Sequence, residues 1–239
     1  EGTPLGRQII DTLRESGRPV IEVRRGREYA KASDRLFEID PDHAADYLQV
    51  LQHTTGAQLE VIHLWSGERE QAAATSLADL DAHLAAGARS LYHLARAWSK
   101  LTDRTSFTLR AVTRGATNAT SPTTELLPER AAAIGMLTSL DQEDPAIVTQ
   151  SIDLSAVGLG AEVIAQELAS ELLRAPLDRE LVLTANGWRI PQMEPVDLVA
   201  ADRRRVTLRN GGVYLVTGGL GGLGRELCRW LAERHSARL

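Results

Sequence analysis

A glycine-dense stretch near the C-terminal end, residues 212–231, constrains the fold of this chain more than any other feature. Its sequence is GVYLVTGGLGGLGRELCRWL, in which an apolar strand candidate at 213–216 runs into a glycine-rich turn and then into an amphipathic helix. A dinucleotide-binding crossover needs this order, because glycines permit a tight turn and let a pyrophosphate approach main-chain N–H groups at the positive end of a helix. The stretch predicts a strand–turn–helix unit with a phosphate-binding turn, and only its beginning, because few residues follow.

The glycines of this stretch fit two motifs. The GxGxxG register uses Gly219, Gly221 and Gly224. The TGxxxGxG register of short-chain dehydrogenases uses Thr217, Gly218, Gly222 and Gly224. A flexible glycine-rich hairpin is the alternative structure. A helix is favoured because apolar residues recur at helical spacing after the turn, at Leu223, Leu227, Trp230 and Leu231.

The composition is that of a soluble globular protein: 43% of the residues are hydrophobic and 25% are charged. The net charge of −5 argues against a nucleic-acid partner, whose phosphates would require a basic face. The single cysteine, Cys228, excludes an internal disulfide and fits a reducing compartment. No apolar run is long enough to span a membrane and no secretion signal is recognisable, so we expect a cytoplasmic protein without a membrane partner.

Strands and helices alternate along the first three quarters of the chain. Helical periodicity predicts helices over 5–13, 41–51, 77–101, 129–140 and 161–174. Extended, apolar patterns predict strands over 20–23, 35–39, 59–64, 106–112, 147–154, 180–184 and 188–190. The alternation indicates an α/β unit with a mostly parallel sheet over 1–200, followed by the start of a second α/β unit over 201–239.

Three local patterns sharpen this outline. Ser76 and Asp79 form a capping signal at the start of the long helix, whose apolar face is predicted to include Leu77. The nearly continuous apolar run at 59–64 is typical of a strand buried on both faces of a parallel sheet. Asn186-Gly187 is a tight-hairpin signature between the last two strands.

The first unit lacks the residues that an enzyme of this architecture would use. No Tyr-x-x-x-Lys pair occurs that could protonate a carbonyl oxygen, and no glycine-rich turn follows its early strands. The six histidines are scattered without the i, i+4 spacing of helical zinc ligands, and His63 is expected to be a hydrogen-bonded core or edge residue. No Gly-x-Ser-x-Gly motif is present. We therefore expect a scaffold with neither catalytic nor metal-binding residues.

A truncated α/β unit joined directly to TGGLGGLG resembles the ketoreductase region of a modular polyketide synthase. The resemblance spans nearly the whole chain and is carried by segments in a fixed order: LEVIHLW at 59–65, GARSLYHLARAW at 87–98, LRAVTRGA at 109–116, residues 129–154, and VYLVTGGLGGLG at 213–224. All but the last are loose individually. The fold that the resemblance implies is a truncated Rossmann-like structural subdomain, followed by the first strand–turn–helix of a second Rossmann unit.

In that family the first subdomain binds no cofactor and supports the second, which reduces a β-ketoacyl group on an acyl carrier protein with NADPH. The resemblance implies that the NADPH pyrophosphate loop comprises Thr217, Gly218, Gly219, Leu220, Gly221, Gly222, Leu223 and Gly224. The family's catalytic Ser, Tyr, Lys and Asn would lie beyond Leu239, so we expect this segment alone to be inactive. Its partners would be the rest of the catalytic subdomain, the neighbouring synthase domains and the carrier-bound β-ketoacyl substrate.

Two alternatives remain open at this point. One is the equivalent region of a multifunctional fatty-acid synthase, which the order of neighbouring domains would distinguish. The other is a non-catalytic module that is retained for architecture. The intact TGGLGGLG turn argues against the second, because an inactive site has no need for glycines that allow close phosphate approach.

Overall fold

A computed structural model describes residues 3–54, 58–67, 73–101, 106–118, 126–155, 159–196 and 207–239. The chain divides into two compact units, Glu1–Gln192 and Met193–Leu239. The domain boundary predicted near residue 200 lies outside the described residues.

The first unit is built on a five-stranded sheet with the order β4-β5-β6-β7-β8. Its strands are β4 (Leu59–His63), β5 (Phe107–Thr113), β6 (Ile147–Leu154), β7 (Glu180–Thr184) and β8 (Gly187–Arg189). The first four run parallel and β8 runs antiparallel to β7. The predicted α/β fold with a mostly parallel sheet is confirmed, and β6 has the predicted bounds.

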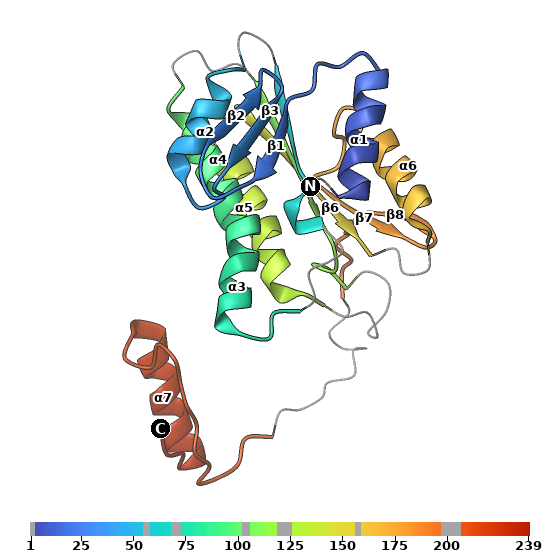
Figure 1. The fold of residues 1–239 in the computed structure, drawn as a ribbon. Helices are drawn as coiled ribbons and strands as arrows, with labels where there is room; N and C mark the ends of the chain where they lie inside the picture. The colour runs from blue at the N-terminus through green and yellow to red at the C-terminus, as the bar shows by residue number, and fades with distance from the viewer. Residues whose placement is uncertain are drawn as a thin grey trace. The chain divides into compact units, whose positions relative to one another are not determined.

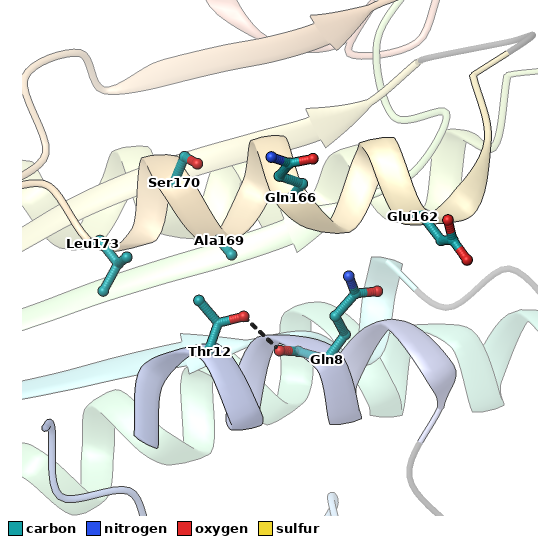
Figure 2. Close-up of a pocket in the computed structure, with 7 residues that line it drawn as sticks. All are labelled: Gln8, Thr12, Glu162, Gln166, Ala169, Ser170 and Leu173. Carbon is teal, nitrogen blue, oxygen red and sulfur yellow. Dashed lines mark hydrogen bonds between the residues drawn. The ribbon is translucent and has the colours of Figure 1, made fainter. Parts of the chain in front are cut away.

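Helices α1 (Pro4–Glu15) and α6 (Ala161–Leu172) lie side by side on one face of this sheet (Figure 1). Their inner side chains form one apolar cluster with the sheet, which includes Ile9 of α1, Leu168 of α6 and Ile152 of β6. Between the two helices lies a groove of about 510 Å³, shown in Figure 2. Its lining consists of Gln8, Thr12, Glu162, Gln166, Ala169, Ser170 and Leu173.

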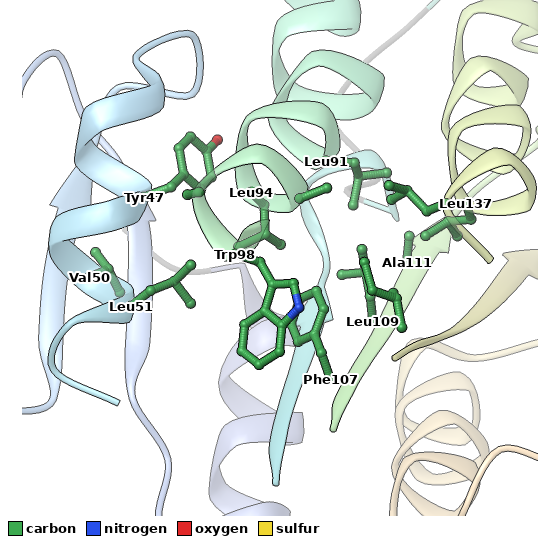
Figure 3. Packing of buried hydrophobic residues seen from close by; sticks show 14 of the residues in the cluster. Tyr47, Val50, Leu51, Leu91, Leu94, Trp98, Phe107, Leu109, Ala111 and Leu137 are labelled. Carbon is green, nitrogen blue, oxygen red and sulfur yellow. The ribbon is translucent and has the colours of Figure 1, made fainter. Parts of the chain in front are cut away.

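Helices α4 (Ser90–Ser99) and α5 (Pro128–Glu143) belong to the second apolar cluster, on the other face of the sheet (Figures 1 and 3). Strand β5 contributes to both faces, because successive side chains of a strand point to opposite sides. Phe107, Leu109 and Ala111 join the α4–α5 cluster, whereas Val112 joins the α1–α6 cluster. The Trp98 ring of α4 stacks on Phe107 with ring centroids 4.6 Å apart.

A small second sheet with the order β1-β3-β2 adds to the α4–α5 side. It comprises β1 (Glu22–Arg25), β2 (Ala30–Ser33) and β3 (Leu36–Ile39), and helix α2 (Ala44–Leu51) follows it. Phe37 and Ile39 of β3 are buried in the cluster together with Tyr47 of α2. The sequence analysis missed β2, because its four residues are all exposed and carry no apolar alternation.

The predicted long helix over 77–101 is divided by a π-helical turn. It consists of α3 (Leu77–Leu84), the π-turn η2 (Ala85–Arg89) and α4. The predicted cap is confirmed: Ser76 Oγ accepts the N–H of Asp79 at 3.1 Å. Leu77, predicted to face the core, is 84% exposed. This prediction was wrong because Leu77 is the first residue of the helix, and the inserted residue of the π-turn also breaks the periodicity that linked it to the inward residues of α4.

Two strand predictions also need correction. The strand predicted to be buried on both faces, β4, is an edge strand, and all its residues except His63 are half-buried. The hairpin between β7 and β8 is confirmed, but Thr184 pairs with Gly187, so its two turn residues are Ala185 and Asn186. Gly187 follows the turn with φ of +94°, a conformation that glycine adopts without steric penalty.

Two arginines fix the C-terminal end of α6 at the sheet. The buried Arg110 of β5 donates hydrogen bonds to the carbonyl oxygens of Glu171 and Arg174. Arg18 donates to the carbonyls of Leu172 and Leu173. The last carbonyls of a helix have no intrahelical partner, so the two guanidinium groups supply the missing donors. Arg18 and Arg110 together hold the C-terminal end of α6 against the parallel sheet.

Candidate functional site

The second unit contains the glycine-rich turn and the helix α7 (Gly222–His235). The predicted strand at 213–216 is present only as a single parallel bridge between Val213 and Arg238. Hydrogen bonds from Tyr214 N to Arg238 O and from Arg238 N to Gly212 O support this bridge, both at 2.9 Å. The prediction of a full strand was wrong, because only the last residues of the chain pair with this segment. The turn is nevertheless followed by the predicted helix, and α7 excludes the flexible-hairpin alternative.

The turn between Val216 and α7 is held by its own backbone. Gly219 N donates to Val216 O at 3.2 Å, and Gly221 N donates to Gly218 O at 2.9 Å. Gly218 has φ of +73°, a left-handed conformation that a side chain would strain. The sequence makes this turn because it places glycine at the position where the chain reverses into the helix.

The turn leads directly into the N-terminus of α7, where no side chain caps the first backbone N–H groups of the helix. Gly221 is the N-cap and has no side chain with which to cap the helix, and the first turn contains no acidic residue. The first N–H groups of a helix have no intrahelical acceptor and carry the positive end of the helix dipole. Such an end attracts an anion.

The last two glycines of the motif play different steric roles. A Cβ placed on Gly224 would lie 2.0 Å from Gly218 O and 2.8 Å from Gly219 Cα. The helix therefore packs so closely against the turn that Gly224 has no room for a side chain. A Cβ placed on Gly222 would meet nothing within 4 Å. Gly224 therefore closes the turn on the helix, while Gly222 leaves the helix end open. The contact involves Gly218 and Gly219 as well as Gly224, so it fits both glycine registers.

The eight residues predicted for the loop lie in one continuous segment around the start of α7. Thr217, Gly218, Gly219 and Leu220 form the turn, and Gly221, Gly222, Leu223 and Gly224 cap and begin the helix. Leu220 and Leu223 are 94% and 91% exposed, and among the described residues 207–239 only Leu231 is buried. The structure therefore brings the backbone of the loop together, whereas these two leucine side chains point into solvent.

In the first unit, the C-terminal ends of β5 and β6 carry a polar cluster that the sequence analysis missed. Asp153 is 1% exposed and pairs in register with Thr113. Its Oδ1 accepts Thr113 Oγ1 at 2.8 Å and Ala116 N at 3.1 Å. Its Oδ2 accepts Thr117 N at 3.1 Å, Thr117 Oγ1 at 2.8 Å and Ser155 Oγ at 2.9 Å. Five donors thus satisfy the carboxylate, which orders the loop after β5.

His63 is a buried, hydrogen-bonded histidine at the end of the edge strand β4, as predicted. Its Nε2 lies 2.9 Å from Ser90 Oγ. Burial, and secondarily the charge of Arg25, lower the pKa of His63 to about 4. A neutral, enclosed imidazole fits a structural role.

The described residues were also searched for metal sites, membrane-spanning helices and other binding grooves. They contain no group of three or more His, Cys, Asp or Glu arranged for a metal ion, and no helix among them is long and apolar enough to cross a membrane. The groove between α1 and α6 offers one carboxylate, Glu162, among amide, hydroxyl and apolar side chains. The glycine-rich turn is therefore the candidate site.

Two family models match this chain. Residues 6–171, more than half of the chain, match the family described as beta-ketoacyl synthase-like, N-terminal. Residues 212–239 match the KR domain. The two matched regions correspond to most of the first unit and to the glycine-rich turn with α7.

Curated relatives match short parts of the chain. A "PKS-NRPS hybrid synthetase acdB" of Aspergillus candidus is 36% identical over 67 residues, which are 28% of this chain and 3% of that protein. A "Highly reducing polyketide synthase 2" of Gibberella zeae is 37% identical over 62 residues, 26% of this chain and 2% of that protein. This chain thus spans a small fraction of the length of both relatives.

Solved structures share the fold over nearly the whole chain. A multidomain keto acid-selecting NRPS module with a ketoreductase superposes with a TM-score of 0.82 and 23% identity over 99% of this chain and 20% of that chain. An N-terminal ketoreductase from a macrolactin assembly line gives 0.70 and 17%, covering 99% of this chain and 46% of that one. A-type ketoreductases from a modular polyketide synthase give 0.59 and 22%, covering 99% and 45%.

The first matched region contains strands β4, β5 and β6 of the parallel sheet, and the second contains the glycine-rich turn and α7. The chain belongs to the beta-ketoacyl synthase-like, N-terminal family, and its residues 212–239 match the KR domain.

Proposed function

We propose that this chain is the structural subdomain and the NADPH pyrophosphate loop of a polyketide synthase ketoreductase. Residues 1–200 serve as a scaffold that binds no cofactor, and residues 201–239 begin the catalytic subdomain. The complete domain reduces a β-ketoacyl intermediate on an acyl carrier protein to the β-hydroxyacyl product with NADPH. The remaining catalytic subdomain and the adjacent synthase domains are its partners.

The observation that carries this proposal is the open helix end behind the glycine-rich turn. A Cβ placed on Gly222 would meet nothing within 4 Å, and the capping residue Gly221 has no side chain that could cover the helix end. A pyrophosphate can therefore approach the first N–H groups of α7, which supply donors and a favourable dipole. When bound, NADPH would supply the hydride, while Thr217–Gly224 would hold its phosphates.

The first test uses Gly222→Ala in the complete ketoreductase domain, that is, this chain with its continuation. The added methyl would meet nothing within 4 Å in this chain, and under the proposed function it would stand in the path of the phosphate. We expect NADPH affinity, measured by fluorescence titration, to fall about 10-fold, the effect of losing one hydrogen bond to a charged group. The thermal melting temperature should not fall. An unchanged affinity would contradict the assignment of this loop to the cofactor.

The second test uses the 239-residue chain by itself. Hydride transfer needs a held cofactor and a proton donor at the carbonyl, and this chain has no Tyr-x-x-x-Lys pair. We expect no oxidation of NADPH above the buffer rate with a simple β-keto thioester, whereas the complete domain should oxidise it. NADPH oxidation by the isolated chain would refute the proposal that its residues support catalysis without supplying the catalytic groups.

A further inference from the structure

Helix α7 packs against the segment before it through one narrow face. The residues of this helix that are not exposed share that face: Gly224, Cys228, Leu231 and His235. They recur at the i, i+4, i+7, i+11 spacing of neighbours on one side of a helix. At one end Gly224 packs against Gly218, and at the other Gly211 N donates to His235 O at 2.7 Å. The position of the glycine-rich turn therefore depends on the side chains of this face.

Cys228 lies on this face one helical turn after Gly224 and is half-buried. A Cβ placed on Gly219 would lie 3.2 Å from Cys228 Sγ and 3.1 Å from Val216 O. The thiol therefore occupies part of the space that a side chain at Gly219 would need. Gly219 does not have a left-handed backbone, so these two contacts, and not its φ angle, are what disfavour a side chain there.

Two packing contacts set the distance between the turn and α7. Gly224 allows the helix to approach Gly218, and Cys228 fills the space beside Gly219. The hydrogen bond from Gly219 N to Val216 O holds the shape of the turn, but it lies within the turn and does not join Gly219 to the helix. Because protein interiors are closely packed, a change of even one methylene at such a contact moves its neighbours. The volume of the side chain at 228 therefore controls where Gly219 lies.

We propose that Cys228 is a positioning residue for the phosphate loop, whose side chain supports Gly219 and so fixes the loop relative to the first N–H groups of α7. This inference rests on the proposed function, in which residues 217–224 hold the phosphates of NADPH. Cys228 acts through Gly219, by its size and shape, and its role requires no thiol chemistry and no contact with the cofactor. A larger side chain would push Gly219 away from the helix, and a shift of about 1 Å in a positioning group is enough to impair a site.

The first test changes the size of the side chain at 228 in the complete ketoreductase domain. Cys228→Leu should lower NADPH affinity at least about 10-fold, because the longer side chain displaces Gly219. Cys228→Ser nearly keeps the size and shape of the side chain, so its affinity should stay within about 3-fold of the wild type. The matched control is Ala232→Leu, which adds bulk at an exposed position of α7 and should leave NADPH affinity unchanged.

A second pair of substitutions tests the contact itself. Gly219→Ala directs a methyl group at the Cys228 thiol and the Val216 carbonyl, so it should weaken NADPH binding. The addition of Cys228→Ala removes one of these two obstacles and should restore the affinity at least about 3-fold. A residue that contributes only to general stability would not restore binding in this way. Additive effects of the two substitutions would overturn the proposal.

The packing of Cys228 also has a readout that needs no cofactor. In the 239-residue chain with labelled glycine, the amide NMR resonances of Gly218 and Gly219 should move in Cys228→Leu and stay in place in Ala232→Leu. Unmoved resonances in Cys228→Leu, or its unchanged NADPH affinity where Gly222→Ala weakens binding, would overturn this inference alone. Absence of NADPH binding by the wild-type complete domain would overturn the proposed function, and this inference with it. If a thermal melt shows that Cys228→Leu does not fold, the Gly219→Ala pair gives the answer.

Discussion

Replacement of Asp153 by alanine should lower the free energy of unfolding by about 2–6 kcal/mol, because it leaves two buried backbone N–H donors without an acceptor, at about 1–3 kcal/mol each. The carboxylate is 1% exposed and accepts five hydrogen bonds, including the backbone N–H groups of Ala116 and Thr117. The three hydroxyl donors can rotate toward other acceptors, but the two backbone donors cannot. Urea denaturation of the 239-residue chain, followed by tryptophan fluorescence, measures the loss.

Two variants show whether the lost acceptors are responsible. Asp153→Asn keeps the volume but places an NH₂ group against donors, so it should also destabilise the fold, by at least about 2 kcal/mol. Asp11→Ala is the control, because Asp11 is exposed on α1 and its one contact among the described residues is a long ion pair of 3.9 Å to Arg14. It should change stability by less than about 0.5 kcal/mol. A loss below 1 kcal/mol in Asp153→Ala would contradict the role assigned to the cluster.

Gly224→Ala should have a larger effect on the proposed cofactor site than Gly222→Ala. The new Cβ would lie 2.0 Å from Gly218 O and 2.8 Å from Gly219 Cα, so the turn and the helix must separate. Alanine raises intrinsic helix stability by about 1 kcal/mol, but this gain cannot restore the position of the turn. In the complete domain we expect NADPH affinity to fall at least about 100-fold, the consequence of a misplaced phosphate loop.

A control variant distinguishes the clash at the glycine-rich turn from the general effect of replacing a helical glycine by alanine. Gly135→Ala, in the middle of α5, adds a methyl that meets nothing within 4 Å. It should leave NADPH affinity unchanged and stabilise the chain by about 0.5–1 kcal/mol. If Gly224→Ala and Gly222→Ala weaken NADPH binding equally, the two glycines do not have the separate roles that the structure gives them.

Local patterns in the sequence predicted most of the first unit. Strand β6 begins and ends where its apolar pattern does, and the cap at Ser76 forms as the spacing indicates. These predictions worked because strand periodicity and capping depend on residues close together in the chain. The turn before a helix was predictable for the same reason, because its shape depends on Gly218 and Gly224, which are close together in the sequence at the start of α7.

Features that depend on distant residues were not predictable in this way. Asp153 and Thr113 are 40 residues apart and meet only because β5 and β6 pair in parallel register. His63 and Ser90 meet because the π-turn sets the rotation of α4. The strand expected at 213–216 shows that a correct local pattern can also fail to predict a structure. Its apolar residues have the correct pattern, but a parallel strand forms only where neighbouring strands supply hydrogen bonds.

The π-turn also restricts which changes in chain length this fold can accept. Between α3 and α4 it accommodates one residue more than a regular helix would, and here Gly87 approaches Ser66 Oγ so closely that a Cβ would lie 2.9 Å away. A deletion within Ala85–Arg89 would improve the local helix but turn α4 by about 100° relative to α3. Ser90 would leave His63, and Trp98 would leave Phe107. Selection should therefore act here on the number of residues as well as on their identity, so single-residue deletions should be rarer than substitutions.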